Sequence, residues 1–135
     1  MKHLVTLFLF MVVSVIPKNG TISYSETYEI RVGHSITYEG LTFCLEAVTS
    51  DSRCPKEVTC VHAGEALAHI KIFEKGKQNI KRVVTFTPTT SSPGVLYSCD
   101  DFTIMAVELS PYPKPHQNID FNNYVLKVLV KSNEF

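Results

Sequence analysis

Residues 51–70 read DSRCPKEVTCVHAGEALAHI, and this stretch decides how the fold is interpreted. Two cysteines, Cys54 and Cys60, flank a short charged loop that contains Pro55, and Gly64 then leads into an alternating apolar run. Proline favours a turn, and alternation of apolar and polar residues is typical of a half-buried strand. The stretch therefore predicts a corner that is closed by a Cys54–Cys60 disulfide and that leads into a β-strand.

The chain has four cysteines, an even number in a short sequence. In an exported protein of this size such a set indicates a disulfide framework, and four cysteines allow three pairings. Because Cys54 and Cys60 are close in sequence, we pair them, which leaves Cys44 and Cys99 to form a second, long-range bridge. A structural zinc site is disfavoured, since it usually needs C-x2–4-C pairs and the sequence has none.

The loop between the cysteines has few apolar residues, so burial alone will not hold its shape. Charge-assisted hydrogen bonds can replace burial, and Arg53 offers a planar fork to Asp51, Glu65 or backbone carbonyls. Asp51 can in addition accept backbone N–H groups within the loop. We therefore predict that Asp51, Arg53 and Glu65 brace the loop, and that Arg53 is at least half buried.

Short runs rich in Val, Ile, Thr, Tyr and Phe alternate with turn residues along the rest of the chain, and helical periodicity is almost absent. This pattern predicts an all-β fold, an antiparallel β-sandwich of about seven or eight strands with two disulfides, and a closed barrel is the main alternative. The expected strands are residues 28–32, 35–38, 41–49, 65–73, 80–87, 95–98, 102–109 and 124–130.

The first residues fit a secretory signal peptide over 1–18, with Lys2 before an apolar run that is too short to span a membrane. The cleavage site stays open, because small residues before Ser14 and the later Pro17 and Gly20 each suit a cut. Residues 19–135 then form a single β-sandwich domain. We expect an exported protein, periplasmic or extracellular, and no cysteine is placed to carry a lipid anchor.

Charge and motifs exclude several classes of function. The chain balances 13 Lys and Arg against 13 Asp and Glu, and no basic stripe is visible, so nucleic acid is not an expected partner. No second apolar run is long enough for stable membrane insertion. No catalytic or nucleotide-binding motif is found, so we expect a protein that is not an enzyme, has no cofactor and is a monomer.

Metal binding is a weak alternative. His62 and His69 flank the Ala63-Gly64 turn and His34 follows another strand, so three imidazoles would bind copper or zinc if the fold gathered them. Asp100 and Asp101 are candidates for calcium, which prefers carboxylate oxygens. Lone surface histidines and turn-capping aspartates are the more common roles, and we favour them.

The chain contains no tryptophan, and its aromatic residues are phenylalanine and tyrosine. Tyr97, Tyr112, Phe121 and Tyr124 would together make a small platform for a glycan if they were exposed on one side. Packing at the ends of the core is the preferred interpretation, because aromatic side chains contribute most when they are buried.

The motif Asp51-Ser52-Arg53-Cys54-Pro55, followed by Cys60 and by Val61-His62-Ala63-Gly64, resembles the signature of a group of uncharacterised exported bacterial β-rich proteins and lipoproteins. That signature is DSRCP, a second cysteine and a W-A-G turn. The later residues 109–113 and 124–128 are similar to the closing strands of the group. His62 stands where the group tends to have tryptophan. The resemblance implies an exported β-rich domain without an established activity.

Three functions remain open. The first is a non-enzymatic exported domain that binds an unknown protein or glycan partner through its loops or an edge strand. The second is a protease-inhibitor-like protein that presents the Cys54–Cys60 loop, because a preorganised loop lowers the ordering cost of binding. The third is a metal-binding protein that uses His62 and His69. Exposure of residues 56–58 would favour the second function, and clustering of the histidines would favour the third.

Overall fold

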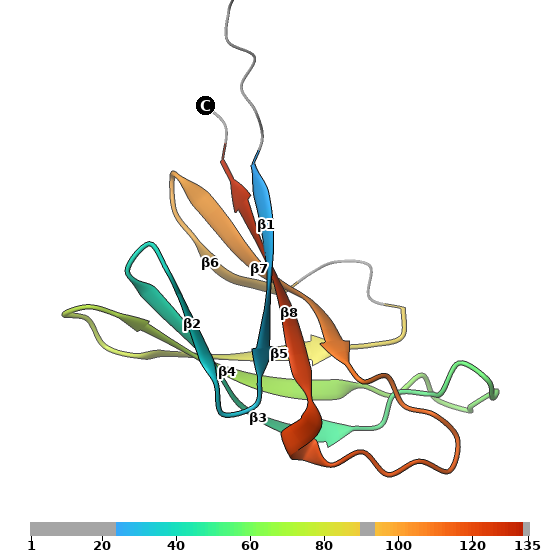
Figure 1. Cartoon of the computed structure of the whole chain (residues 1–135). Helices are drawn as coiled ribbons and strands as arrows, with labels where there is room; N and C mark the ends of the chain where they lie inside the picture. The colour runs from blue at the N-terminus through green and yellow to red at the C-terminus, as the bar shows by residue number, and fades with distance from the viewer. Residues whose placement is uncertain (1–23, 90–93, 134–135) are drawn as a thin grey trace, which may run out of the picture.

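The computed structural model of the chain describes residues 24–89 and 94–133 (Figure 1). The predicted signal peptide over 1–18 lies outside the described residues, as do the first residues of the predicted domain. No helix in the described part of the chain is long and apolar enough to cross a membrane.

Eight antiparallel strands form two four-stranded sheets, in the orders β1-β8-β7-β6 and β2-β3-β4-β5. The prediction of an all-β antiparallel fold is therefore confirmed. A short 3-10 turn, η1 (Phe121–Asn123), precedes the last strand. The strands are β1 (Ser25–Arg31), β2 (Ser35–Tyr38), β3 (Leu41–Asp51), β4 (Ala66–Glu74), β5 (Ile80–Phe86), β6 (Gly94–Ser98), β7 (Phe102–Ser110) and β8 (Val125–Ser132).

The hydrophobic alternation sets which face of each strand is buried. In β4 the small and branched residues Ala66, Ala68, Ile70 and Ile72 all lie in the core, and the residues between them are half-buried. Side chains of a strand alternate between the two faces of a sheet, so this spacing of two places every apolar residue of the set on one face.

Strand β3 departs from the predicted alternation. The sequence pattern places Ala47 on the same face as Leu45, but the pairing with β4 shifts between Leu45 and Ala47. Such an irregularity inserts a residue and reverses the faces beyond it. Val48 is therefore the residue that is buried, whereas Ala47 is half-buried.

One hydrophobic cluster contains residues of both sheets. Phe43 and Leu45 of β3 belong to it, and so do Leu126 and Val128 of β8. Figure 1 shows β3, β4 and β5 running across the direction of β1 and β8. Apolar burial of this kind contributes about 25 cal/mol per Å2 of surface removed from water, so the shared cluster is the main source of stability.

The predicted Cys44–Cys99 disulfide is wrong, and the fold has one disulfide rather than two: Cys54–Cys60 is bonded, while Cys44 and Cys99 are free thiols. Cys44 lies on β3 between Phe43 and Leu45, and because those two are buried it lies on the opposite face of the sheet. Cys99 follows β6, which belongs to the other sheet. Cys44 therefore lies on the outer face of its sheet, away from the sheet that carries Cys99.

Candidate functional site

The loop that joins β3 to β4 begins as a continuation of their pairing. The Ser52 N–H donates to the Glu65 carbonyl at 2.8 Å, and the Cys54 N–H donates to the Ala63 carbonyl at 2.8 Å. The Ser52 hydroxyl also bonds the backbone N–H and C=O of Glu65, each at 3.1 Å. Glu65 thus braces the loop through its backbone. Its predicted side-chain bond to Arg53 is not among the bonds that Arg53 makes.

Gly64 is required where the loop returns to β4. Its φ is +70°, and a Cβ at this position would lie 1.7 Å from the carbonyl oxygen of Ser52. Real side chains do not tolerate such a contact with backbone, and the positive φ adds strain for any other residue. Glycine therefore permits the close approach of the two sides of the loop base.

Arg53 is buried, with 5% of its surface exposed, and it is paired with Asp51. The guanidinium donates to both carboxylate oxygens of Asp51, from Nε at 2.8 Å and from Nη2 at 2.6 Å. Asp51 also accepts the Arg53 backbone N–H at 3.2 Å. A two-bond fork of this kind fixes orientation as well as charge, so the predicted bracing by Asp51 and the predicted burial of Arg53 agree with the structure.

The same ion pair connects the loop to the other sheet. Arg53 donates from Nη1 to the carbonyl of Leu109 at 2.9 Å and from Nη2 to that of Pro111 at 3.1 Å. The Tyr124 hydroxyl, just before β8, donates to Asp51 Oδ2 at 2.6 Å. The end of β3, the end of β7 and the start of β8 therefore meet at one buried charge pair.

These contacts shift the pKa values of the Asp51 carboxyl and the Tyr124 hydroxyl. Burial opposes ionisation of Asp51, but the Arg53 guanidinium, the Tyr124 hydroxyl and the Arg53 backbone N–H favour the carboxylate, and together they hold the pKa of Asp51 below its ordinary value. Burial and the hydrogen bond to Asp51 raise the pKa of Tyr124 well above its usual range. Asp51 is therefore charged and Tyr124 neutral at physiological pH.

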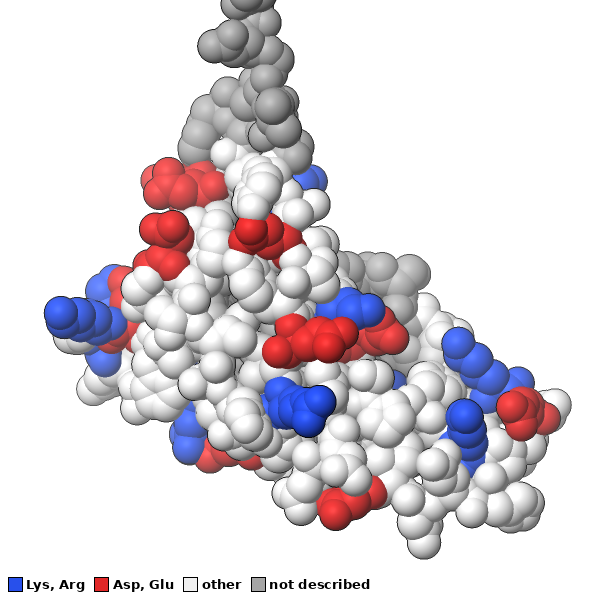
Figure 2. Space-filling model, viewed as in Figure 1, with Lys and Arg blue, Asp and Glu red and all other residues white. Residues whose placement is uncertain are grey.

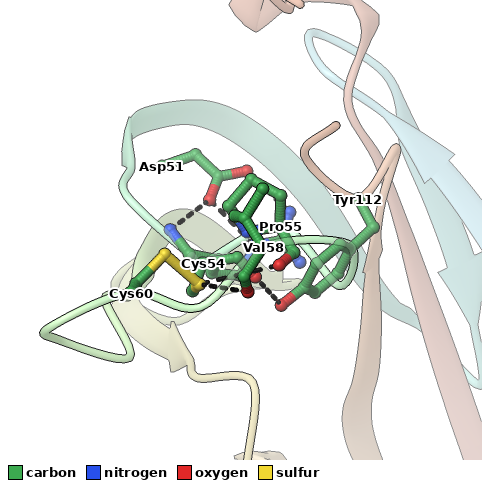
Figure 3. The surroundings of a disulfide bond; sticks show 7 residues. Asp51, Cys54, Pro55, Val58, Cys60 and Tyr112 are labelled. Carbon is green, nitrogen blue, oxygen red and sulfur yellow. Dashed lines mark hydrogen bonds and ion pairs between the residues drawn. A yellow bond between two sulfur atoms is a disulfide. The ribbon is translucent and has the colours of Figure 1, made fainter. Parts of the chain in front are cut away.

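Tyr112 covers the outer side of this pair. Its ring centroid lies 4.7 Å from the guanidinium carbon of Arg53 and 5.3 Å from the Lys56 Nζ, and both are cation–π contacts. Its hydroxyl donates to the Cys54 carbonyl at 2.8 Å (Figure 3). Tyr112 thus holds the base of the disulfide loop against the segment that follows β7.

The tip of the loop is exposed, in contrast to its base. The Cys54–Cys60 disulfide spans 6.0 Å between Cα atoms, and the Val58 N–H donates to the Pro55 carbonyl at 3.3 Å in a tight turn. Residues 56–63 are all exposed, with Val61 at 95% and Val58 at 45% of their surface. In Figure 1 this loop projects from the ends of β3 and β4.

Three hollows meet around Lys56 and Tyr112. One of about 390 Å3 lies between the ends of β5 and β7, one of about 420 Å3 lies beside the disulfide, and one of about 230 Å3 lies against the proline-rich residues 113–115. All three are lined by both Lys56 and Tyr112. On the face seen in Figure 2, most of the surface is uncharged, and small groups of acidic and basic side chains are scattered over it, in keeping with the balanced charge.

The residues proposed for metal binding lie in separate elements. His34 is in the β1–β2 turn, His62 is in the disulfide loop, and His69 is on β4, where its Nε2 bonds the hydroxyl of a neighbouring threonine at 2.9 Å. Asp100 and Asp101 form the β6–β7 turn. Among the described residues, no group of three or more His, Cys, Asp or Glu side chains is arranged to hold a metal ion.

The four aromatic residues proposed for a glycan platform are also divided. Tyr124 is buried and stacks on Phe121, with 6.1 Å between ring centroids, whereas Tyr97 packs beside Phe102. Tyr112 instead covers the loop base. The roles of Tyr112 and Tyr124 as partners of the Asp51–Arg53 pair were missed from sequence. Those partners lie 58 or more residues away along the chain, and no local pattern signals the contact.

Comparison with protein-family models, with curated proteins and with solved structures finds no match to this chain.

Proposed function

We propose that this chain is an exported, non-enzymatic β-sandwich domain that binds a protein partner through its disulfide loop. The observation that supports the proposal is the contrast within residues 51–65. The base contains a buried ion pair, while residues 56–63 are exposed. A structural corner would pack its apolar side chains down on the sheet, but Val61 is almost fully exposed.

The architecture suits recognition for a physical reason. Binding costs free energy whenever a flexible loop must be ordered, and a loop that is already fixed avoids most of that cost. Here the disulfide, the Pro55–Val58 turn and the Tyr112 hydroxyl fix the loop before any partner arrives. The valines at its tip then offer apolar surface that a partner can cover.

The test is a capture experiment from the native extracellular fraction, followed by measurement of affinity with the purified captured protein. The variant Val58→Ser/Val61→Ser removes the apolar tip and is expected to lower affinity by about tenfold or more, since each buried valine contributes roughly 1.5 kcal/mol. Val83→Ser is the matched control, because Val83 of β5 is 56% exposed and lies outside the loop. Equal affinity for all three proteins would contradict the proposal.

Exposure of Lys56, Glu57 and Val58 also favours a protease inhibitor as a second candidate. A protruding loop closed by a disulfide is able to enter an enzyme cleft without ordering cost. Titration of serine and cysteine proteases with the purified protein tests this function directly. Inhibition by the wild-type protein that disappears after reduction of the Cys54–Cys60 disulfide would establish this function. The absence of inhibition at micromolar protein would exclude it for the proteases tested.

A further inference from the structure

Arg53 also lines a groove, besides bracing the loop. The groove, of about 390 Å3, is bounded by Val84 and Phe86 at the end of β5 and by Leu109 of β7. Its size lies in the range of sites that hold a small ligand or a few residues of a peptide, about 300–1,000 Å3. The groove is therefore large enough to be a binding site distinct from the loop tip.

One of the five guanidinium N–H groups of Arg53 is not used in the hydrogen bonds that hold the loop. A guanidinium has five N–H groups. Four bonds are made, to the two oxygens of Asp51 and to the carbonyls of Leu109 and Pro111. Nη1 itself is bonded, through the Leu109 carbonyl, and its second N–H makes no hydrogen bond to a described residue. That N–H is therefore available to an acceptor in the groove.

Lys56 supplies a second cation at the same place. It lines the groove and lies over the Tyr112 ring, and none of the ion pairs between described residues includes it. The groove also contains Glu108, but that carboxylate pairs with Lys127 at 2.8 Å. The charge of Arg53 is balanced by Asp51, so the ammonium of Lys56 leaves the groove with an excess positive charge.

The walls of the groove are strand ends. Among residues 24–89 and 94–133, the pairing of β6 with β7 runs as far as Gly94 and Ala106, and Arg53 donates to the carbonyl of Leu109 further along β7. The residues between them, Val107 and Glu108, line the groove opposite the end of β5. An extended segment laid along strand ends can use backbone hydrogen bonds for affinity and side-chain contacts for specificity.

We infer that this groove binds an extended acidic peptide segment of a partner protein, and that a carboxylate of the segment meets the free N–H of Arg53 and the ammonium of Lys56. The apolar neighbours of that carboxylate would lie against Val84 and Phe86. This site is separate from the valine tip of the loop, so it does not rest on the function proposed above.

Titration of the labelled full chain with the peptide Ac-Val-Glu-Val-NH2 tests the inference by nuclear magnetic resonance. Saturable shifts are expected for the Arg53 Nε–H and the Leu109 amide, and the peptide Ac-Val-Gln-Val-NH2 should bind roughly tenfold more weakly, because it lacks the charge. Lys56→Gln should remove the difference between the peptides. Lys75→Gln, an exposed change in the β4–β5 turn, should preserve it.

With the two peptides, three outcomes would overturn the inference. They are the absence of saturable shifts up to about 10 mM peptide, equal binding of the two peptides, and an unchanged preference in Lys56→Gln. Acetate that binds as tightly as the Glu peptide would show a small-anion site instead of a peptide site, which also contradicts the inference. The variant Val58→Ser/Val61→Ser should titrate like the wild type, so failure here and failure of the loop-binding function are distinguishable.

Discussion

Replacing Arg53 with alanine tests how much the buried ion pair contributes to folding. The change removes the guanidinium from a site that is 5% exposed and leaves Asp51, whose side chain is 3% exposed, without a counter-charge. It also removes the donors to the carbonyls of Leu109 and Pro111. The structure therefore predicts a loss larger than any surface substitution would cause.

The magnitude follows from the burial of the remaining charge. Breaking a buried pair by removing one partner typically costs about 3–5 kcal/mol in the free energy of unfolding, because the other charge stays desolvated. For a domain of this size that loss corresponds to a fall in melting temperature of roughly 10–25 °C. The double variant Asp51→Ala/Arg53→Ala leaves no buried charge, so it should recover about 1 kcal/mol or more relative to Arg53→Ala alone.

Guanidinium unfolding followed by far-UV circular dichroism and tyrosine fluorescence measures both variants, since the chain has no tryptophan. Arg82→Ala is the matched control, because Arg82 is exposed on β5, and it should change the free energy of unfolding by no more than about 0.5 kcal/mol. The reasoning is refuted if Arg53→Ala costs less than about 1 kcal/mol, or if the double variant is no more stable than the single one.

Three further predictions concern the loop and the thiols. Gly64→Ala should lower the free energy of unfolding in urea by roughly 3 kcal/mol or more. Gly40→Ala, where a Cβ meets nothing within 4 Å, should lower it by only about 1–2 kcal/mol, and equal losses would contradict the close approach of Gly64 to Ser52. Because the pKa of Asp51 is lowered in the folded state, the stability that the pair adds is complete above about pH 4 and is lost as the pH falls through the folded-state pKa. Unfolding measured against pH should show this loss in the wild type and not in Arg53→Ala, and a wild type without the loss would disagree. Thiol titration of the unreduced, denatured chain should find two reactive thiols, those of Cys44 and Cys99. A titration that finds no thiol would show instead that these two cysteines form a second disulfide.

Much of the fold could be predicted because its cause is local. The alternation of Ala66, Ala68, Ile70 and Ile72 indicates a half-buried strand whatever its neighbours are, and β4 lies where the pattern places it. The short spacing of Cys54 and Cys60 likewise favours a disulfide between these two cysteines, and that bond is present. The pattern on β3 failed at the irregularity after Leu45, since a bulge depends on the partner strand and has no fixed sequence signature.

Contacts between distant segments could not be predicted. Pairing Cys44 with Cys99 assumed that two leftover cysteines meet, but the assignment of the strands to sheets places them apart. Arg53 was predicted to be at least half buried, with Asp51, Glu65 or backbone carbonyls as its partners. It is buried, and it bonds the Asp51 side chain, which is only two positions away. Its bonds to the carbonyls of residues 109 and 111 depend on where β7 ends in space, which local patterns do not determine.

Hydrogen exchange of the backbone amides tests most directly the claim that a fixed base carries an exposed tip. The amides of Ser52 and Cys54 bond across the loop base at 2.8 Å, so they should be protected nearly as well as those of β4, while those of Lys56 and Val61 should exchange rapidly. In Arg53→Ala, the protection of Ser52 and Cys54 should fall well before that of β4. Rapid exchange at Ser52 and Cys54 in the wild type, or unchanged protection in the variant, would contradict the account.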